Sequence, residues 1–524
     1  MVTPPMISIK RALLSCHDKT GLEGFAKALA ALGIELVASG GTAEFLTQHG
    51  LRVKTVEAFA GMTEQLDGRV KTLHPKVHAG ILARRDDAAH VQAVGPDGLI
   101  DLVVVNLYPF QRTVEQPGVS VAQALEQIDI GGVALLRAAA KNFAHVAVVC
   151  RPQQYDDVAA KLREKKGCLD EPFAQRLAVE AFAETSAYDT WIAGYLAWVG
   201  ASRASGGVAE LPDAATFTVR KRQALRYGEN PHQRGAWYVP SGGSLWGLGT
   251  LRQLQGKELS YNNLLDVDAA LRCLADFAEP ACVIVKHHSQ CGLASASTPR
   301  EAYERAYACD AESAFGGVVG VNRPVDEAIA KQLAETFLEV VVAPAVDPKA
   351  AALLGKKTNL RVVTVEWPGV LPQEPEWRQL LGSWLAQEPD RQIMDPGTIR
   401  VVTKRPPTDA ERRDLLFTWT AAKHVTSNGV VIARGAATVG IGQGQPSRVG
   451  SVRLAIEKAG PRARQAVAAS DGFFPFPDSV ELLAGAGVTA VIQPGGSMRD
   501  REVVAASDAA GLAMLVTGIR HFRH

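Results

Sequence analysis

The chain has 524 residues, of which 47% are hydrophobic and 21% are charged. A single hydrophobic core stops growing at roughly 250 to 300 residues, so this length predicts two or three domains. Lysine and arginine together number 56, against 55 for aspartate and glutamate. This balance argues against the broad basic surface that gathers nucleic acid or an anionic membrane, so any anion should bind at a local site.

The beginning of the chain, MVTPPMISIKRALLS, lacks the pattern of a secretory leader. No apolar run approaches the ~20 residues of a membrane helix. The seven cysteines are scattered and form no CxxC pairs, which is typical of reduced thiols in the cytosol. We therefore expect a soluble cytoplasmic protein without a membrane partner.

In the first 200 residues, apolar strands, short polar loops and amphipathic helices follow one another in turn, which is the pattern of an α/β fold. Strands are predicted at 9–14, 34–38, 101–106 and 145–150, and helices at 22–32, 43–50 and 131–142. The strands are apolar throughout, so we expect a parallel sheet that is covered on both faces.

The segment ASRASGGVAELPDA, residues 201–214, is small, polar and aperiodic, and it is the predicted linker between domains 1–200 and 215–524. Strands and helices also alternate in the second domain. Its clearest strands are predicted at 281–286, 429–433, 488–493 and 512–517. A proline-rich patch near 366–376 suggests an internal division.

Two loops of the first domain, SCHDKTG (15–21) and SGGT (39–42), lie between a strand and a helix start. Free N–H groups and the helix dipole favour an anion there, and Lys19 would add a full charge. Serine, threonine and glycine are also ordinary caps and turn residues, so either loop alone is more often structural. Together they favour a phosphate cradle, because loops after neighbouring parallel strands meet at one edge.

Reactive side chains follow other segments of this domain: Lys71 in GRVKTLHPKVHAGI, Tyr108 in NLYPF and Asp129 in IDIGG, with Lys141 further along a helix. Taken singly, such a lysine or aspartate is more often a solvated surface charge. The pattern alone leaves both interpretations open.

The strings SCHDKTGL, SGGT, GRVKTLHPKVHAGILARR, VVNLYPF and IDIGGVALLRAAAKN resemble the inosine monophosphate (IMP) cyclohydrolase domain of bifunctional purine biosynthesis proteins, a domain similar in fold to methylglyoxal synthase. The resemblance implies that Lys71, Tyr108, Asp129 and Lys141 are catalytic. It implies that phosphate and ribose contact Ser15, Lys19, Thr20, Ser39, Gly40, Gly41, Thr42, Arg69 and Thr72, with the base near Asn106. A lysine can polarise a formyl oxygen while a carboxylate assists proton removal, so this step requires no cofactor.

In the second domain, Lys286 and His287 fall at the end of an apolar strand, where α/β enzymes often carry reactive groups. Such a pair can donate and accept protons in one reaction. The alternative is a pair that binds backbone carbonyl groups at a strand end. The same dipeptide recurs as Lys423-His424 before a strand, so the pair itself is weak support.

The segments RKRQALRYGENPHQ, LQGKELSYNNLLDVDAA, EPACVIVKHHSQCG, ESAFGGVVGVN, KHVTSNGVVIA, GIGQGQPSRV, SDGFFPFPD and TGIRHF resemble, in this order, the transformylase half of the same family. The resemblance implies two cytidine-deaminase-like α/β subdomains without zinc. The H-x-E and P-C-x-x-C signature of zinc deaminases is indeed not found, and no catalytic metal is expected.

This resemblance implies that Lys286, His287 and Asn428 are catalytic. The implied nucleotide contacts are Arg226, Tyr227, His232, Phe315, Gly316, Glu339 and Arg448, and the implied folate contacts are Val449, Phe473, Gly495, Gly496 and Arg520. Ser289 and Gln290 replace the Asn-Pro that usually follows the Lys-His pair, and GQGQPSR stands for the usual GAGQxSR. Loss of a proline frees φ and restores a backbone donor, so we expect an altered loop.

The resemblance implies a bifunctional enzyme and a homodimer. It would transfer a formyl group from 10-formyltetrahydrofolate to the 5-amino group of aminoimidazole carboxamide ribonucleotide (AICAR) and then close the ring to IMP with loss of water. Two other functions are weighed against it. A regulatory nucleotide-binding protein would need the cradle residues but none of the reactive side chains. A methylglyoxal-synthase-type lyase would leave about 310 residues of the chain unexplained.

Overall fold

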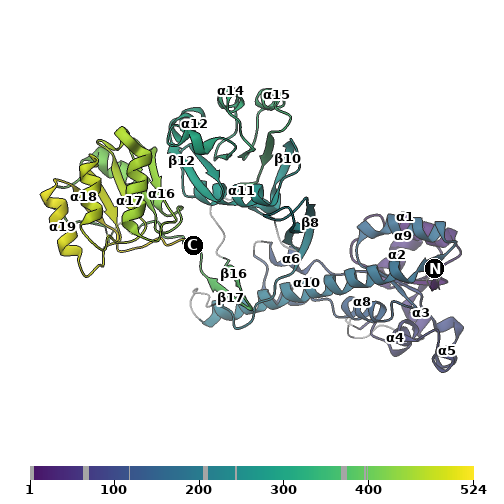
Figure 1. The fold of residues 1–524 in the computed structure, drawn as a ribbon. Helices are drawn as coiled ribbons and strands as arrows, with labels where there is room; N and C mark the ends of the chain where they lie inside the picture. The colour runs from purple at the N-terminus through teal and green to yellow at the C-terminus, as the bar shows by residue number, and fades with distance from the viewer. Residues whose placement is uncertain are drawn as a thin grey trace. The chain divides into compact units, whose positions relative to one another are not determined.

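The computed structural model describes residues 5–62, 66, 70–116, 118–204, 211–241, 245–367, 374–394, 397 and 399–524. The chain divides into two compact units. Unit 1 comprises Met1–Val219 and Pro240–Gly243, and unit 2 comprises Arg220–Val239 and Ser244–His524 (Figure 1). Among the described residues, no helix has the length and apolar character that a membrane span requires.

Unit 1 is built on a parallel sheet of five strands in the order β4-β3-β2-β5-β6. The strands are β2 (Arg11–Cys16), β3 (Glu35–Ala38), β4 (Lys54–Thr55), β5 (Leu102–Asn106) and β6 (Ala147–Val149). All of β5 is buried, as an apolar central strand between helical layers must be. The predicted parallel sheet is confirmed, although the strand expected at 9–14 runs from Arg11 to Cys16.

The helices predicted at 22–32 and 131–142 are confirmed, with observed bounds of 22–31 and 131–141. Helix α1 (Leu22–Ala31) buries Leu22, Phe25, Ala26 and Leu29 against the sheet. The other helices are α2 (Gly40–Gln48), α3 (Val56–Ala60), α4 (Pro75–Leu82), α5 (Ala88–Val94), α6 (Phe110–Val114), α7 (Val121–Leu125), α8 (Gly131–Lys141), α9 (Tyr155–Glu164) and α10 (Glu171–Ala204). A small antiparallel pair joins β1 (Met6–Ser8) to β7 (Cys168–Asp170).

Two sequence predictions in unit 1 are corrected. The SGGT segment is not a loop, because Ser39 is the extended N-cap residue of α2, and Gly40 to Thr42 form the first helical turn. The linker expected from residue 201 starts too early, because α10 continues to Ala204 through an alanine-containing stretch that favours helix. Of the remaining linker residues, 205–210 lie outside the described part and 211–214 contain no helix or strand.

Unit 2 contains two six-stranded sheets with equivalent strand orders, β10-β15-β14-β13-β11-β12 and β18-β23-β22-β21-β19-β20. The first, with its helices, is called half A, and the second half B. In each sheet the last two strands of the order, β11-β12 or β19-β20, form an antiparallel hairpin, and the next strand, β13 or β21, pairs antiparallel with that hairpin. The following two strands continue in parallel, and the first strand of the order, β10 or β18, is an antiparallel edge. The predicted internal division is confirmed, since sheet A ends at Thr364 and sheet B begins at Arg400.

The elements of half A are β10 (Arg252–Gln255), α11 (Tyr261–Leu274), β11 (Ala281–Lys286), β12 (Ser289–Ser295), α12 (Pro299–Tyr307), α13 (Ala311–Ala314), β13 (Val318–Val321), α14 (Glu327–Glu335), β14 (Val340–Ala343), α15 (Pro348–Leu354) and β15 (Arg361–Thr364). Two hairpins, β8 (Val219–Leu225) with β9 (Gly235–Pro240) and β16 (Glu376–Leu380) with β17 (Ser383–Gln387), accompany it.

The elements of half B are β18 (Arg400–Val401), α16 (Asp409–Ala422), β19 (Val430–Ala433), β20 (Thr438–Gly442), α17 (Arg448–Ala459), β21 (Val467–Ser470), α18 (Asp478–Gly485), β22 (Ala490–Gln493), α19 (Asp500–Ala509) and β23 (Ala513–Val516).

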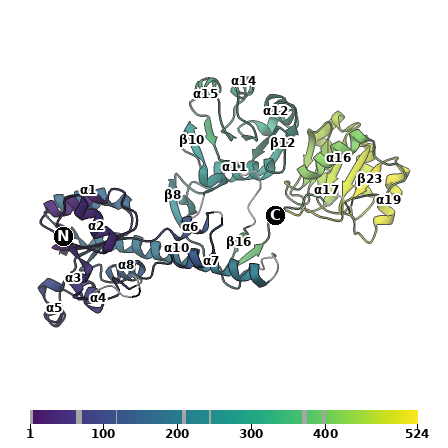
Figure 2. The ribbon, with the colours of Figure 1, turned by 180° about the vertical axis from the view of Figure 1, so that it is seen from behind.

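The strands of unit 2 send alternate side chains into different cores, as the twofold period of a strand requires. In β11, Val283 and Val285 join one apolar cluster with α11 and α16, while Cys282 and Ile284 join a second cluster with α12 and α14. The cluster around α11 and α16 also includes Val431 of β19, so the two sheets share it. In half A, α11 lies on one face of its sheet, and α12, α14 and α15 lie on the other (Figure 2).

Helix α17 approaches β20 closely because β20 carries glycine where the two backbones meet. A Cβ atom at Gly442 would lie 1.9 Å from the main-chain oxygen of Ser451. Only a residue without a side chain fits at this distance. The close packing fixes the start of α17, which carries Arg448, against the sheet.

Candidate functional site

In unit 1, three neighbouring strand ends meet at the carboxyl edge of the sheet. The Oγ atoms of Ser15 and Ser39 lie 2.9 Å apart, which joins β2 to the N-cap of α2. The hydroxyl of Thr42 accepts a hydrogen bond from the N–H of Cys16 at 3.0 Å. The predicted convergence of the SCHDKTG and SGGT segments is therefore confirmed, since both follow adjacent parallel strands, although the second is a helix start.

A cationic cradle forms around the first turn of α2. The Lys19 Nζ atom donates to Thr42 Oγ1 at 3.1 Å and to the main-chain oxygen of Cys16. Burial lowers the pKa of Lys19, although the nearby Cys16 and Asp18 oppose the shift. A Cβ atom at Gly40 would lie 3.8 Å from Lys71 Nζ, so that ammonium group also faces the turn. A helix start flanked by two ammonium groups suits a phosphate.

Asp129 lies at the other side of this edge, at the start of α8. Its Oδ1 accepts the N–H of Gly132 at 2.7 Å, and its own N–H donates to the Tyr188 hydroxyl of α10 at 2.8 Å. Burial raises the pKa of the Asp129 carboxyl, more than the backbone N–H groups of Gly132 and Tyr108 lower it. A carboxylate with a raised pKa is a better proton acceptor than an ordinary surface aspartate.

Neighbouring side chains complete this edge. Tyr108 is 41% exposed, and its ring lies edge-on to that of His17 with 5.4 Å between the centroids. Thr72 Oγ1 would lie 2.6 Å from a Cβ atom at Gly131, so this hydroxyl covers the start of α8. The amide of Asn106 binds the main chain of Asp18 at 2.8 and 2.9 Å, which shapes the first loop from inside.

Two expected residues of unit 1 stand apart from this group, and a third cannot be compared with it. Lys141 is the last residue of α8 and is exposed. Because a helix rises 1.5 Å per residue, Lys141 lies roughly 15 Å along the axis from the end that holds Asp129. Thr20 is exposed on the first loop, with its N–H bound to Asp18. Arg69 lies outside the described residues. The roles of all three stay predictions.

Sequence reasoning gave no role to His17 and Tyr188, which the structure brings to Asp129 and Tyr108. His17 stands inside the quoted SCHDKTG string, so its place in the loop was a usable signal. Tyr188 contacts Asp129, which lies 59 residues earlier in the sequence, and no local sequence pattern predicts such a contact.

In unit 2, the strand end that carries Lys286 meets the segments before β13 and β14. Lys286 Nζ donates to the main-chain oxygen of Phe315 at 2.8 Å. The Gly316 N–H donates to the main-chain oxygen of Phe337 at 2.8 Å, and Asn263 Nδ2 donates to Glu339 Oε2 at 2.8 Å. The predicted residues Lys286, Phe315, Gly316 and Glu339 therefore lie along one edge of sheet A.

His287 and His288 form the two-residue turn between β11 and β12, with φ angles of 51° and 62°. Two successive positive φ values are the requirement of a type I′ hairpin turn, for which histidine is an uncommon choice. The His288 N–H donates to Asp266 Oδ1 at 2.6 Å, and burial raises the pKa of that carboxyl. Asp266 thus holds the turn and was missed by the sequence reasoning. The expected altered loop is a tight hairpin in which Ser289 and Gln290 begin β12.

Two of the predicted residues of half B, Asn428 and the buried Arg448, are hydrogen-bonded to one another. Arg448 is 7% exposed, and it donates to Ser470 Oγ at 2.7 Å, to Asp471 Oδ1 and to Asn428 Oδ1 at 2.7 Å. Asn428 Nδ2 donates to the main-chain oxygen of Gln445 at 2.9 Å. Both side-chain ends of Asn428 are therefore held, which fixes its orientation.

The remaining half B residues follow the ends of parallel strands. Phe473 comes after β21, the pair Gly495-Gly496 after β22 and Arg520 after β23, and these strands are adjacent. Phe473 is 43% exposed, and the Arg520 guanidinium lies 4.6 Å from the ring centroid of Phe522. Val449 is the second residue of α17. Exposed aromatic and glycine positions at one sheet edge are suited to a flat ring system.

The hairpin of half A is connected to the Asn428 segment through three glutamines. Gln290 Nε2 donates to the main-chain oxygen of His424 at 3.3 Å, and Gln443 Nε2 donates to the main-chain oxygen of Gln290 at 3.1 Å. Gln445 Nε2 donates in turn to the main-chain oxygen of Gln443 at 3.3 Å. The two catalytic candidates of half A and Asn428 of half B therefore belong to one connected region.

Arg226, Tyr227 and His232 follow β8. The Arg226 guanidinium lies 5.6 Å from the ring centroid of Tyr227, and Arg226 and His232 are exposed. Their nucleotide contacts stay predictions.

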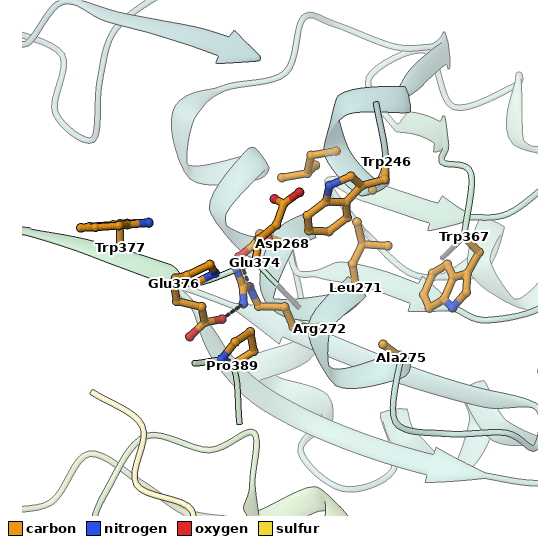
Figure 3. Close-up of a pocket in the computed structure, with 13 residues that line it drawn as sticks. Trp246, Asp268, Leu271, Arg272, Ala275, Trp367, Glu374, Glu376, Trp377 and Pro389 are labelled. Carbon is orange, nitrogen blue, oxygen red and sulfur yellow. Dashed lines mark hydrogen bonds and ion pairs between the residues drawn. The ribbon is translucent and has the colours of Figure 1, made fainter. Parts of the chain in front are cut away.

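A separate cavity of about 290 Å³ in unit 2 is lined by Trp246, Trp367 and the ion pairs of Arg272 with Asp268 and Glu376 (Figure 3). None of the predicted site residues lines it.

Within the described ranges, no group of three or more histidine, cysteine, aspartate or glutamate side chains is placed to hold a metal ion. The two units thus present two distinct sets of reactive groups. One is a cationic cradle near the half-buried carboxylate of Asp129, and the other is a lysine-histidine strand end connected to a buried arginine. This combination of folds and sites is that of a bifunctional α/β metabolic enzyme.

Comparison with known proteins identifies which one. A family model described as the AICARFT/IMPCHase bienzyme matches residues 139–458, and an MGS-like domain model matches residues 21–134. Three bifunctional purine biosynthesis proteins PurH are among the similar relatives. Those of Cyanothece sp., Cereibacter sphaeroides ATCC 17029 and Anoxybacillus flavithermus are 48%, 49% and 46% identical to this chain, covering 98%, 99% and 98% of it and 99%, 99% and 100% of the relative. The chain belongs to the AICARFT/IMPCHase bienzyme family, and it is a bifunctional enzyme of purine biosynthesis with formyltransferase and IMP cyclohydrolase activities.

Proposed function

We propose that unit 2 transfers a formyl group from 10-formyltetrahydrofolate to the 5-amino group of AICAR, and that unit 1 closes the formylated product to IMP. The half-buried Asp129 beside a cationic cradle supports the second assignment, and the connected Lys286-His287 and Asn428 region supports the first. The single observation that carries the division is that each set of groups lies within one compact unit.

For ring closure, the carboxamide nitrogen attacks the formyl carbon. Asp129 accepts the proton that this nitrogen loses, and its raised pKa suits that role. The Lys71 ammonium polarises the formyl oxygen, which leaves as water after protonation. The phosphate lies at the start of α2, between Lys19 and Lys71. Tyr108, which is 41% exposed, orients the base together with Asn106. Lys141 and Arg69 belong to the proposal by resemblance alone.

For formyl transfer, the AICAR amine attacks the formyl carbon on the folate nitrogen. His287 takes up the amine proton through the substrate carboxamide, and Lys286 gives a proton to the departing folate nitrogen. The second amide hydrogen of Asn428 Nδ2, beyond the one bound by Gln445, bonds the developing formyl oxyanion. Arg448, Phe315, Gly316 and Glu339 position the nucleotide, and Phe473 and the Gly495-Gly496 turn receive the folate ring.

Neither alternative function accounts for these groups. A regulatory nucleotide-binding protein would have no use for a half-buried carboxylate with a raised pKa, such as Asp129, next to the cradle. A lyase restricted to unit 1 would have no use for Lys286, His287 and Asn428. We further propose, from family resemblance, that the protein is a cytoplasmic homodimer that needs no catalytic metal.

One assay tests the proposal. Full-length protein is supplied with AICAR and 10-formyltetrahydrofolate, and tetrahydrofolate and IMP are followed separately. We expect both to form, with formylated AICAR as the intermediate. Lys286→Ala should abolish tetrahydrofolate formation and spare the closure of added formylated AICAR. Lys71→Ala should have the opposite effect. A variant pair that showed the reverse pattern would overturn the division of labour.

A further inference from the structure

A buried ion pair with an added histidine joins the two halves of unit 2. Asp276 follows α11 of half A, and Lys423 and His424 follow α16 of half B directly. Lys423 Nζ lies 2.8 Å and His424 Nε2 lies 2.6 Å from the same oxygen, Asp276 Oδ2. The three side chains are 13%, 6% and 6% exposed, respectively. The formyl transfer chemistry proposed above uses none of them.

The protonation states in this cluster are complementary. Burial disfavours the charged form of Asp276, but the His424 hydrogen bond and the Lys423 charge hold its pKa below the ordinary value. Burial also lowers the pKa of His424, more than its hydrogen bond to Asp276 raises it. A neutral imidazole that donates its Nε2–H to a carboxylate, with one ammonium group beside it, satisfies this arrangement.

The cluster lies directly behind the formyl transfer region. The main-chain oxygen of His424 accepts a hydrogen bond from Gln290 Nε2 at 3.3 Å, and Gln290 pairs with Val285, the residue before Lys286. In the other direction, Asn428 is four residues after His424 in the same segment. The segment 423–428 therefore contacts the His287 hairpin at one end and carries Asn428 at the other.

Stability alone does not account for a buried charge pair here. Replacing such a pair by apolar residues is often neutral or stabilising, because desolvation offsets the attraction. The halves already share an apolar core, in which the rings of Phe277 and Phe417 lie 5.7 Å apart. Apolar packing tolerates small displacements of one half relative to the other. Two donors on one carboxylate oxygen define a single relative position of the two segments.

We propose that Asp276 is a positioning residue for formyl transfer. Its carboxylate, through Lys423 and His424, fixes the segment 423–428 of half B against the hairpin of half A. It thereby sets the distance between Asn428 and the Lys286-His287 pair. The proposal rests on the roles given above to these three residues, and misplacement of reacting groups by about 1 Å can cost on the order of 100-fold in rate.

The test uses full-length protein and removes both charges together, in the double variant Asp276→Leu with Lys423→Met. No charge is then left buried without a partner, and only the Nε2–H of His424 loses its acceptor, so the variant should fold with a Tm lowered by no more than several degrees. We expect the formyl transfer kcat to fall by about tenfold or more, with the KM for AICAR changed by less than about threefold. Closure of added formylated AICAR should be unchanged.

Two further variants separate positioning from general damage. Asp276→Glu keeps the charge and should recover most of the kcat that Asp276→Asn loses. Lys458→Met removes a partly exposed ion pair between the same halves, 2.6 Å from Asp310, and should leave kcat within about twofold. A double variant with wild-type formyl transfer kcat would overturn the proposal, as would equal losses of formyl transfer and ring closure. If Lys286→Ala and Asn428→Ala were themselves fully active, the roles assigned to those residues would fail instead.

Discussion

The side chain of Gln443 donates a hydrogen bond from Nε2 to the main-chain oxygen of Gln290 at 3.1 Å. These are two of the positions at which the chain differs from the motifs that the family resemblance implies. The Oε1 atom of Gln443 also accepts a hydrogen bond from the N–H of Thr426 at 3.5 Å. Two departures that are 153 residues apart in sequence therefore contact one another beside the formyl transfer region.

Replacing Gln443 should loosen this contact. Gln443→Ala removes the donor to Gln290, and a hydrogen bond of this kind contributes about 1 kcal/mol, or about fivefold in an equilibrium. We expect formyl transfer to slow by roughly that factor and ring closure to keep its rate. Gln253→Ala, at an edge strand where the amide binds only its own loop, serves as the matched control. Equal effects of the two variants would remove any special role for Gln443.

The His287-His288 turn allows a side chain to be changed without changing its backbone preference. Asparagine tolerates positive φ, so His287→Asn and His288→Asn should both keep the turn. His287→Asn should lower formyl transfer by roughly 100-fold, the scale of a lost general base. His288→Asn should cost far less. If His288→Asn proved as damaging as His287→Asn, with both variants folded, His287 would not be the proton acceptor.

Asp129 should control the acid side of the pH profile for ring closure. Its pKa is raised by burial, so the carboxylate is lost as the pH falls through a value above the ordinary ~3.9 of aspartate. The rate of ring closure should therefore decline at a higher pH than an exposed aspartate would give. Asp129→Asn should lower the rate by roughly 100-fold and make formylated AICAR accumulate. An unchanged pH profile in that variant would exclude Asp129 as the base.

The close approach of α17 to β20 predicts a stability effect. Gly442→Ala would place its Cβ atom against the main chain of Ser451, so the helix must move, at a cost of about 1 to 3 kcal/mol or more. Arg448 would move with the helix, and formyl transfer should weaken. Gly485→Ala, in α18 with open space around the added carbon, should be neutral or slightly stabilising. Urea unfolding of both variants measures the difference.

Local pattern and resemblance together predicted much of this protein. The strand at 281–286 is observed over those residues, and the two loops of unit 1 meet as parallel strands require. The turn at His287 and His288 was not predicted, because neither residue is a usual choice for positive φ. Contacts such as that of Gln290 with His424 join residues 134 apart, and no periodicity encodes them. The resemblance implied two subdomains of one kind in the second domain, and the equivalent strand orders of the two halves agree with it, although no sequence repeat was visible.

The distribution of the apolar cores has a consequence for heating. The core of unit 1 is a cluster of its own, whereas the cluster around α11 and α16 extends through both sheets of unit 2. Half A and half B should therefore melt together, since neither can lose its inner layer without exposing that of the other. Unit 1 has a separate core, so it can unfold at a different temperature. Calorimetry should then record two transitions, and between their midpoints the enzyme should retain one of its activities without the other.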